Sequence, residues 1–114
     1  MNYVDGFVAA VKNAKRDEYR AFAEKSVPMF KEYGTLKVVE TWADDVPEGE
    51  VTSFTMAVKR EADESVVFSW ITWPSKEARD TAWAKIIEDD RMQGEMPFDG
   101  KRLIHGGFQV IVDG

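Results

Sequence analysis

The sequence predicts an α+β fold, a ferredoxin-like antiparallel sheet with two helices on one face, and two observations support this. Segments with strand and helix patterns follow one another in the order β-α-β-β-α-β, with one additional strand-like segment. The chain has 114 residues, of which 44% are hydrophobic and 32% charged, the profile of a globular domain. We therefore expect residues 1–114 to form a single domain.

The first half of the chain is predicted to contain a strand, a long helix and a second strand. Residues 3–11 and 36–43 are rich in β-favouring side chains and predict the strands. Residues 15–34 predict the helix, which Gly34 is placed to end because a residue with positive φ is favoured there. Pro28 lacks a backbone N–H, so we expect a kink or break about one turn before it. The helical spacing predicts a buried stripe of Tyr19, Phe22, Ala23, Phe30 and Tyr33.

The second half is predicted to contain a hairpin, a helix and a final strand. Residues 51–59 and 66–73 form the hairpin, and 51–59 either belongs to one bent strand over 36–59 or adds an edge strand. Ser75 is the expected N-cap of the second helix, and residues 103–112 are the last strand. The helix is expected to reach about Asp89 and to bury Ala82, Trp83, Ile86 and Ile87.

The strands are apolar on both faces, which predicts a homodimer. In the last strand one face carries Ile104, Phe108, Val110 and Val112, and the other carries Leu103, His105, Gln109 and Ile111. The 66–73 strand places Phe68 and Trp70 on one side and Val67, Ile71 and Trp73 on the other. Two helices on one face leave the second face uncovered, and a second copy of the same sheet is the simplest cover.

Charge and composition exclude several classes of function. The chain has 21 acidic and 15 basic residues, and the bases are interleaved with acids, so binding to nucleic acid or to an anionic membrane is not expected. No apolar stretch approaches the roughly 20 residues that span a bilayer, and the N-terminus has no signal-peptide pattern. The absence of cysteine excludes disulfides and thiolate metal sites. We expect a cytoplasmic protein without a cofactor.

Five short segments resemble one known family. They are residues 2–7 (NYVDGF), 67–70 (VFSW), 73–76 (WPSK), 96–102 (MPFDGKR) and 106–108 (GGF). Over essentially the whole chain, the sequence resembles the YbaA-like family of small bacterial proteins, which has no established activity. The resemblance implies the dimeric α+β-barrel superfamily, in which ferredoxin-like subunits pair through their sheets. That superfamily contains cofactor-independent monooxygenases, haem-using enzymes, isomerases and proteins of unknown role.

His105 and Asp5 are the candidate catalytic residues. His105 is the only histidine, which excludes a two-histidine metal site within one chain, and it points towards the partner sheet if Ile104 and Phe108 face the helices. Asp5 is an acid in an apolar strand, and the expected topology brings it near His105 or Arg102. The alternative uses are an interface histidine and a structural ion pair. The charged residues that begin the second helix are expected to be solvated: Lys76, Arg79 and Asp80.

The leading functional hypothesis is a dimeric barrel that binds a small organic molecule in a cavity of each subunit. The expected cavity residues are Glu40, Trp42, Trp70 and Arg102 together with Asp5 and His105, which mix aromatic and ionisable groups within apolar strands. An alternative is a cofactor-independent enzyme, monooxygenase-like or isomerase-like, with His105 or an acid as its base. A second alternative is a structural or protein-interaction module with a filled barrel. The sequence does not decide whether the protein is an enzyme.

Overall fold

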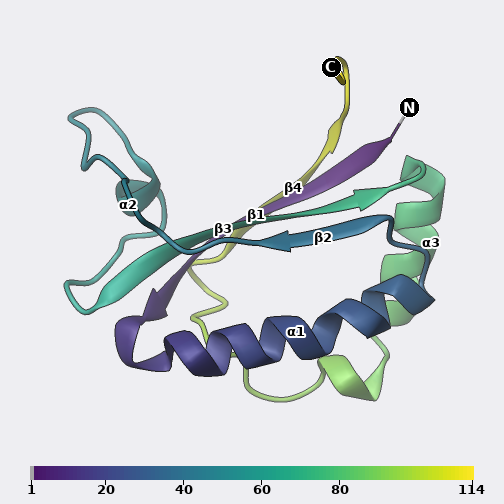
Figure 1. The fold of residues 1–114 in the computed structure, drawn as a ribbon, viewed down its shortest axis with the longest axis horizontal. Coiled ribbons are helices and arrows are strands. Elements are labelled where there is room, and N and C mark those ends of the chain that lie inside the picture. Colours follow the sequence, from purple (N-terminus) through teal and green to yellow (C-terminus); the bar gives the residue numbers. More distant parts are fainter. Residues whose placement is uncertain (1) are drawn as a thin grey trace.

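A computed structural model describes residues 2–114 and contains a four-stranded antiparallel sheet with its two long helices packed on one face (Figure 1). The strands are β1 (Tyr3–Lys12), β2 (Lys37–Glu40), β3 (Glu64–Trp73) and β4 (Ile104–Gln109), in the spatial order β2-β3-β1-β4. The helices are α1 (Arg16–Glu32), α2 (Phe54–Ala57) and α3 (Lys76–Ile86), with short 3-10 turns at Asn13–Lys15 and Asp90–Met92. This strand order confirms the predicted ferredoxin-like fold.

The main core lies between the sheet and helices α1 and α3. Strand β1 pairs with β3 along its whole length, from Tyr3 opposite Trp73 to Lys12 opposite Glu64. Because strand side chains alternate between faces, the odd-numbered residues of β1, β3 and β4 point towards the helices. The buried core consists of Tyr3, Met29, Phe30, Ile71, Trp73, Ala82 and Ile86. No helix within residues 2–114 is long and apolar enough to cross a membrane.

Helix α1 continues through Pro28 without a break, so the predicted interruption is wrong (Figure 1). Pro28 removes one backbone hydrogen bond to the carbonyl of Glu24. Both residues are exposed, so water can bond the freed carbonyl and the cost is small. The helix ends as predicted, because Gly34 follows it with a φ of 98°. The predicted stripe is confirmed at its buried members Tyr19, Ala23 and Phe30.

Helix α3 begins as predicted and ends earlier than predicted. Ser75 has extended backbone angles, and its hydroxyl accepts a hydrogen bond of 3.0 Å from the backbone N–H of Ala78. Ala82 and Ile86 are buried, but the helix ends at Ile86 and leaves Ile87 67% exposed. The predicted burial of Ile87 is therefore wrong.

Residues 51–59 form neither a bent strand nor an edge strand, which corrects both alternatives. The hydroxyl of Ser53 accepts a hydrogen bond of 3.1 Å from the N–H of Met56 and caps the single-turn helix α2. The segment folds back onto the sheet face that α1 and α3 leave uncovered, where Val58 is completely buried against Ala10 and Val66 (Figure 1). Local capping and burial of one residue therefore outweigh the β-propensity of the segment.

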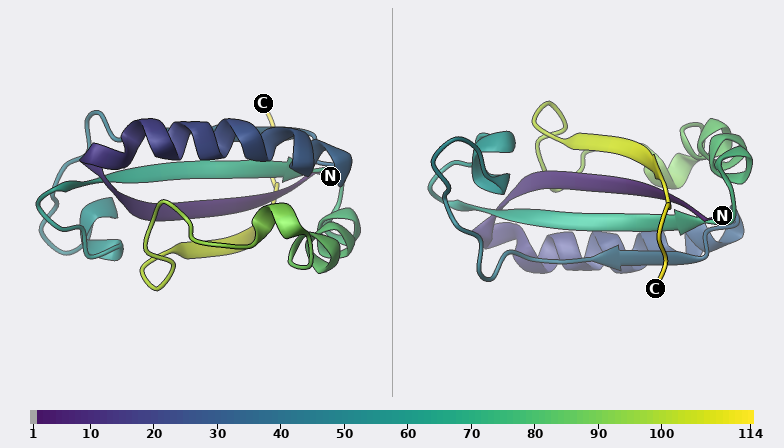
Figure 2. Two further views of the ribbon diagram at one scale, coloured as in Figure 1. Left: turned by 90° about the horizontal axis from the view of Figure 1, so that it is seen from below. Right: turned by 90° about the horizontal axis from the view of Figure 1, so that it is seen from above.

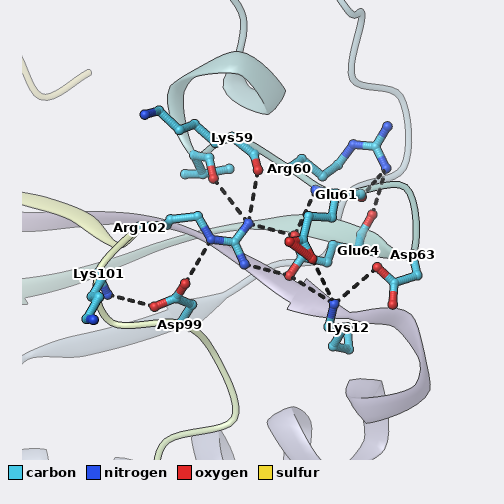
Figure 3. Close-up of polar contacts among 10 residues, drawn as sticks. Lys12, Lys59, Arg60, Glu61, Asp63, Glu64, Asp99, Lys101 and Arg102 are labelled. Atoms are coloured by element: carbon cyan, nitrogen blue, oxygen red, sulfur yellow. Dashed lines mark hydrogen bonds and ion pairs between the residues drawn. The ribbon is translucent and has the colours of Figure 1, made fainter.

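Arg102 fastens this insertion to the sheet through the network drawn in Figure 3. Its guanidinium makes a two-point ion pair with the buried carboxylate of Glu64, at 2.8 and 2.7 Å. It also donates to the carbonyl of Lys59 at 3.0 Å, just after α2, and to Asp99 at 3.0 Å in the turn before β4. Lys12 lies 3.8 Å from Glu64 and adds a second positive charge. Arg102 therefore joins three separate parts of the chain.

Replacing Glu64 by glutamine is expected to destabilise the protein strongly at neutral pH and weakly in acid. The Arg102 guanidinium lowers the pKa of Glu64 from 4.5 to about 2 in the folded state. The carboxylate therefore contributes stability that is complete above pH 4.5 and is lost as the pH falls towards 2. Because a difference of one in pKa corresponds to about 1.4 kcal/mol, the contribution is on the order of 3 kcal/mol.

Urea unfolding of wild type and Glu64→Gln at several pH values between 7 and about 2.5 tests this linkage. The difference in unfolding free energy should shrink steadily as the pH falls. Glu61→Gln is the matched control, because Glu61 also bonds Lys12 but is 59% exposed, and it should change stability little at any pH. If Glu64→Gln lowered the unfolding free energy by the same amount at every pH, the stabilising role assigned to the ionised Glu64 carboxylate would be contradicted.

Candidate functional site

The sheet face opposite α1 and α3 is apolar and largely uncovered, and we call it the open face. It is formed by Val4, Gly6, Val8, Phe68, Trp70, Ile104, Gly106 and Phe108. Phe108 is 63% exposed, and its ring lies over Gly6 and Gly106, 3.7 Å from where a Cβ would stand on either. The C-terminal residues leave β4 and cross above this face, with Ile111 and Val112 more than 80% exposed (Figure 2).

His105 lies on the helix side of the sheet, so the prediction that it faces a partner sheet is wrong. That prediction required Ile104 and Phe108 to face the helices, and they lie on the open face instead. His105 pairs with Phe7 in the register and stacks on its ring, with 6.4 Å between the centroids and 28° between the planes. The residue is exposed at the edge strand. Asp5 pairs with Gly107 and not with His105.

Asp5 is buried and fully engaged by three side chains. It is 3% exposed, and one carboxylate oxygen accepts hydrogen bonds from the indole N–H groups of Trp73 and Trp83, at 2.9 and 2.8 Å. Arg79 donates from Nε and Nη2 at 3.1 and 2.7 Å. The structural ion pair, given above as the alternative use of Asp5, is therefore present. Its partner is Arg79, which was expected to be solvated, and not Arg102.

Gly107 makes room for this ion pair. A Cβ at this position would lie 2.8 Å from Nη2 of Arg79 and would collide with the ring and hydroxyl of Tyr3. The Arg79 guanidinium also lies over the Tyr3 ring, 5.3 Å from its centroid. The space left by the missing side chain of Gly107 is therefore occupied by Arg79 and Tyr3.

The candidate site is a groove between α1 and β2, which we call the α1–β2 groove. It has a volume of about 330 Å³ and is lined mainly by Arg16, Tyr19, Ala23, Val27, Glu40 and Trp42. Two of the predicted cavity residues, Glu40 and Trp42, meet here. Trp70 lies on the open face, because the register pairs it with Val39, and Arg102 belongs to the ion-pair network described above. A single cavity containing all the predicted residues is not formed within the protomer.

The groove combines an acid–phenol pair with an aromatic wall. The hydroxyl of Tyr19 donates a short hydrogen bond to Glu40. Burial and the neighbouring carboxylate both raise the pKa of Tyr19, so its proton stays on the phenol. Burial also raises the pKa of Glu40, and the Tyr19 hydrogen bond opposes that shift. Trp42 packs at a tilt against Tyr19, with 6.3 Å between the ring centroids.

Arg16 completes the groove, and sequence reasoning missed it. Its guanidinium lies 5.5 Å from the centroid of the Trp42 ring. Arg16 and Tyr19 are three residues apart, so they share one face of α1, and that face meets the edge strand β2. The sequence signal that could have located this groove was Tyr19, which lies on the predicted buried stripe. The hydroxyl of a buried tyrosine needs a hydrogen-bond partner. Within residues 2–114, no cluster of three or more metal-ligating side chains is formed.

Asp5→Asn is expected to lower the unfolding free energy by about 2–4 kcal/mol, because it removes the charge that Arg79 and both indoles require. Asp80→Asn is the matched control. Asp80 also accepts a 2.9 Å bond from Arg79, but it is 46% exposed, and its loss should cost less than about 1 kcal/mol. Chemical denaturation at pH 7 measures both. Equal effects of the two substitutions would contradict the structural role of Asp5.

Comparison with known structures supports the fold. A dimeric ferredoxin-like protein from an uncultured marine organism has a TM-score of 0.62 at 9% identity, covering 100% of both chains. A candidate antibiotic biosynthesis monooxygenase from Bacillus cereus has a TM-score of 0.53 at 14% identity, covering 99% of this chain and 96% of the other. At these identities, both comparisons establish a shared fold only.

Comparison of sequences establishes the family. The uncharacterized protein YbaA of Escherichia coli K12 is 60% identical over 116 residues, which cover 99% of this chain and 99% of YbaA. YbaA of Shigella flexneri is similar to the same extent. Residues 2–100 match the family described as a protein of unknown function, DUF1428. These matches confirm the resemblance noted in the sequence, and the chain belongs to the DUF1428 family, together with YbaA.

Proposed function

We propose that this protein is a homodimer that binds a small organic molecule in the α1–β2 groove of each protomer. The observation that carries the proposal is the convergence of Tyr19, Glu40, Trp42 and Arg16 on one groove. Its volume of about 330 Å³ lies at the lower end of the range typical of ligand sites, about 300–1,000 Å³. A few polar groups on an aromatic and aliphatic wall are the usual composition of such sites.

The open face supports the homodimer. A four-stranded sheet with strands about 4.8 Å apart and about eight residues long presents roughly 500 Å². A specific interface needs about 800 Å² per partner, and the C-terminal residues that cross above the face and the α2 insertion at its end supply further area. The face is apolar and has few charges, so a second copy of the same face matches it in chemistry and size. The dimeric ferredoxin-like relative has the same fold.

A second candidate function is proton transfer on a ligand in the same groove, without a cofactor. The feature that favours it is Glu40, an exposed residue at the groove whose carboxylate accepts the Tyr19 hydroxyl and whose pKa is raised by partial desolvation there. In this reaction Glu40 is the base that accepts a proton from the bound molecule. His105 is not among the residues that line the groove, so this proposal assigns the role of the base to Glu40. A purely structural module, by contrast, requires no ligand in the groove.

Phe108→Asp is expected to convert the dimer to monomers, because it places a charge within the apolar surface of the proposed interface. Loss of this contact should raise the dissociation constant by about a hundredfold or more. Ile87→Asp is the matched control, since Ile87 is exposed to a similar extent, 67% against 63%, but lies after α3 and away from the open face. Analytical ultracentrifugation over a range of concentrations measures both. A monomeric wild type, or equal loss in both variants, would refute the proposed interface.

Native mass spectrometry of gently purified protein tests ligand binding. The wild type should carry an additional small mass, and Val27→Phe should lose it because the larger ring fills the groove. Ala21→Phe adds the same ring on the exposed side of α1, outside the groove, and should keep the mass. The binding function would be contradicted if the wild-type protein carried no additional mass and its groove residues showed no chemical-shift changes in NMR titrations with small organic compounds.

A further inference from the structure

We infer that the α1–β2 groove selects a small aromatic carboxylic acid that also bears a hydroxyl group. This inference rests on the proposed function and adds the chemical class of the ligand. It follows from three features of the groove: one uncommitted positive charge, an aromatic and aliphatic wall, and one acceptor oxygen.

The uncommitted charge is Arg16. Arg20 and Glu24 also line the groove, but they form an ion pair with each other at 2.9 Å. Glu40 accepts the hydrogen bond of Tyr19. In the part of the chain that the structure describes, the ion pairs of the groove do not include Arg16, which contacts the Trp42 ring instead. A carboxylate on the ligand is the partner that its planar guanidinium fits best.

The wall of the groove favours a flat ring. Trp42 and Tyr19 present aromatic surface, and Ala23, Val27 and Val38 present aliphatic surface. A ring bound here buries apolar area against both kinds of side chain. The volume of about 330 Å³ limits the ligand to about one or two rings, since typical ligand sites begin near that size.

The acceptor is the carboxylate of Glu40. Tyr19 bonds Oε1, and Ser69 on the neighbouring strand also approaches the carboxylate, but a carboxylate has about four acceptor sites, so Glu40 can still accept a hydrogen bond from a hydroxyl of the ligand. The acidic end of the ligand is repelled by Glu40 and lies towards Arg16. Arg16 and Tyr19, the residue that bonds Glu40, are three residues apart on α1, so both polar groups line the same groove. A phosphate-rich ligand is disfavoured, because Glu24 and Glu40 both line the groove.

The test compares four probes by isothermal titration calorimetry against purified protein. The probes are 4-hydroxybenzoate, benzoate, 4-hydroxybenzyl alcohol and 4-hydroxycyclohexanecarboxylate, each of which lacks at most one of the three features. We expect 4-hydroxybenzoate to bind most tightly and each of the other probes to bind about tenfold more weakly. The inference would be overturned if 4-hydroxybenzyl alcohol or 4-hydroxycyclohexanecarboxylate bound in the groove as tightly as 4-hydroxybenzoate or more tightly.

Two substitutions test which residue contacts the carboxylate of the ligand and which contacts its hydroxyl group. Arg16→Gln should abolish the preference for 4-hydroxybenzoate over 4-hydroxybenzyl alcohol, whereas Lys25→Gln, which removes an exposed positive charge of α1 outside the groove, should retain it. Glu40→Gln should reduce the preference for 4-hydroxybenzoate over benzoate. Unchanged preferences in Arg16→Gln would overturn the inference.

The probes also separate failure of this inference from failure of the proposed function. Binding of a different chemical class that Val27→Phe abolishes and Ala21→Phe preserves would refute the aromatic acid and leave the groove as a binding site. No binding of any probe, together with no retained mass in native spectra, would refute both.

Discussion

The buried carboxylate of Asp5 is the interaction on which the helix side of the structure depends. A single ionised group in the interior is costly unless it is paired and fully hydrogen bonded. Here the donors come from β3, through Trp73, and from α3, through Trp83 and Arg79. Any displacement of α3 across the sheet breaks several of these bonds at once. The ion pair also requires a glycine at position 107 on the neighbouring strand, because the Arg79 guanidinium occupies the space where a larger residue would place its side chain.

The remaining charges divide into those that hold the fold and those that remain available. Arg102 and Glu64 bind the α2 insertion to the ends of β1 and β3, so both are committed to structure. Arg16 and Glu40 lie beside β2, at the far edge of the sheet from β4, and each retains capacity for another partner. Binding of a ligand at this edge, as proposed, would therefore leave intact the ion pairs that maintain the sheet.

Local patterns predicted the elements of the fold better than the arrangement of the site. Ser75 and Gly34 marked helix ends because capping depends on nearby backbone groups. The orientation of β4 was not predictable from alternation alone, since both of its faces carry apolar side chains. The Asp5–Arg79 pair joins residues 74 positions apart, and no local pattern encodes such a contact. Glu40 and Trp42 were predicted together because they are close in sequence within the segment predicted as one strand, although β2 itself ends at Glu40.

The short edge strand β2 also determines what kind of assembly the apolar sheet can form. It has only four residues, and Lys37 and Glu40 place charges at its two ends. Short, charged edges resist the addition of further strands, a process that continues without limit once it begins. Pairing of open faces, in contrast, consumes the same surface on both partners and is complete with two copies. If the open faces pair as proposed, the assembly is complete with two copies, and the short charged edge of β2 does not extend it into a fibre.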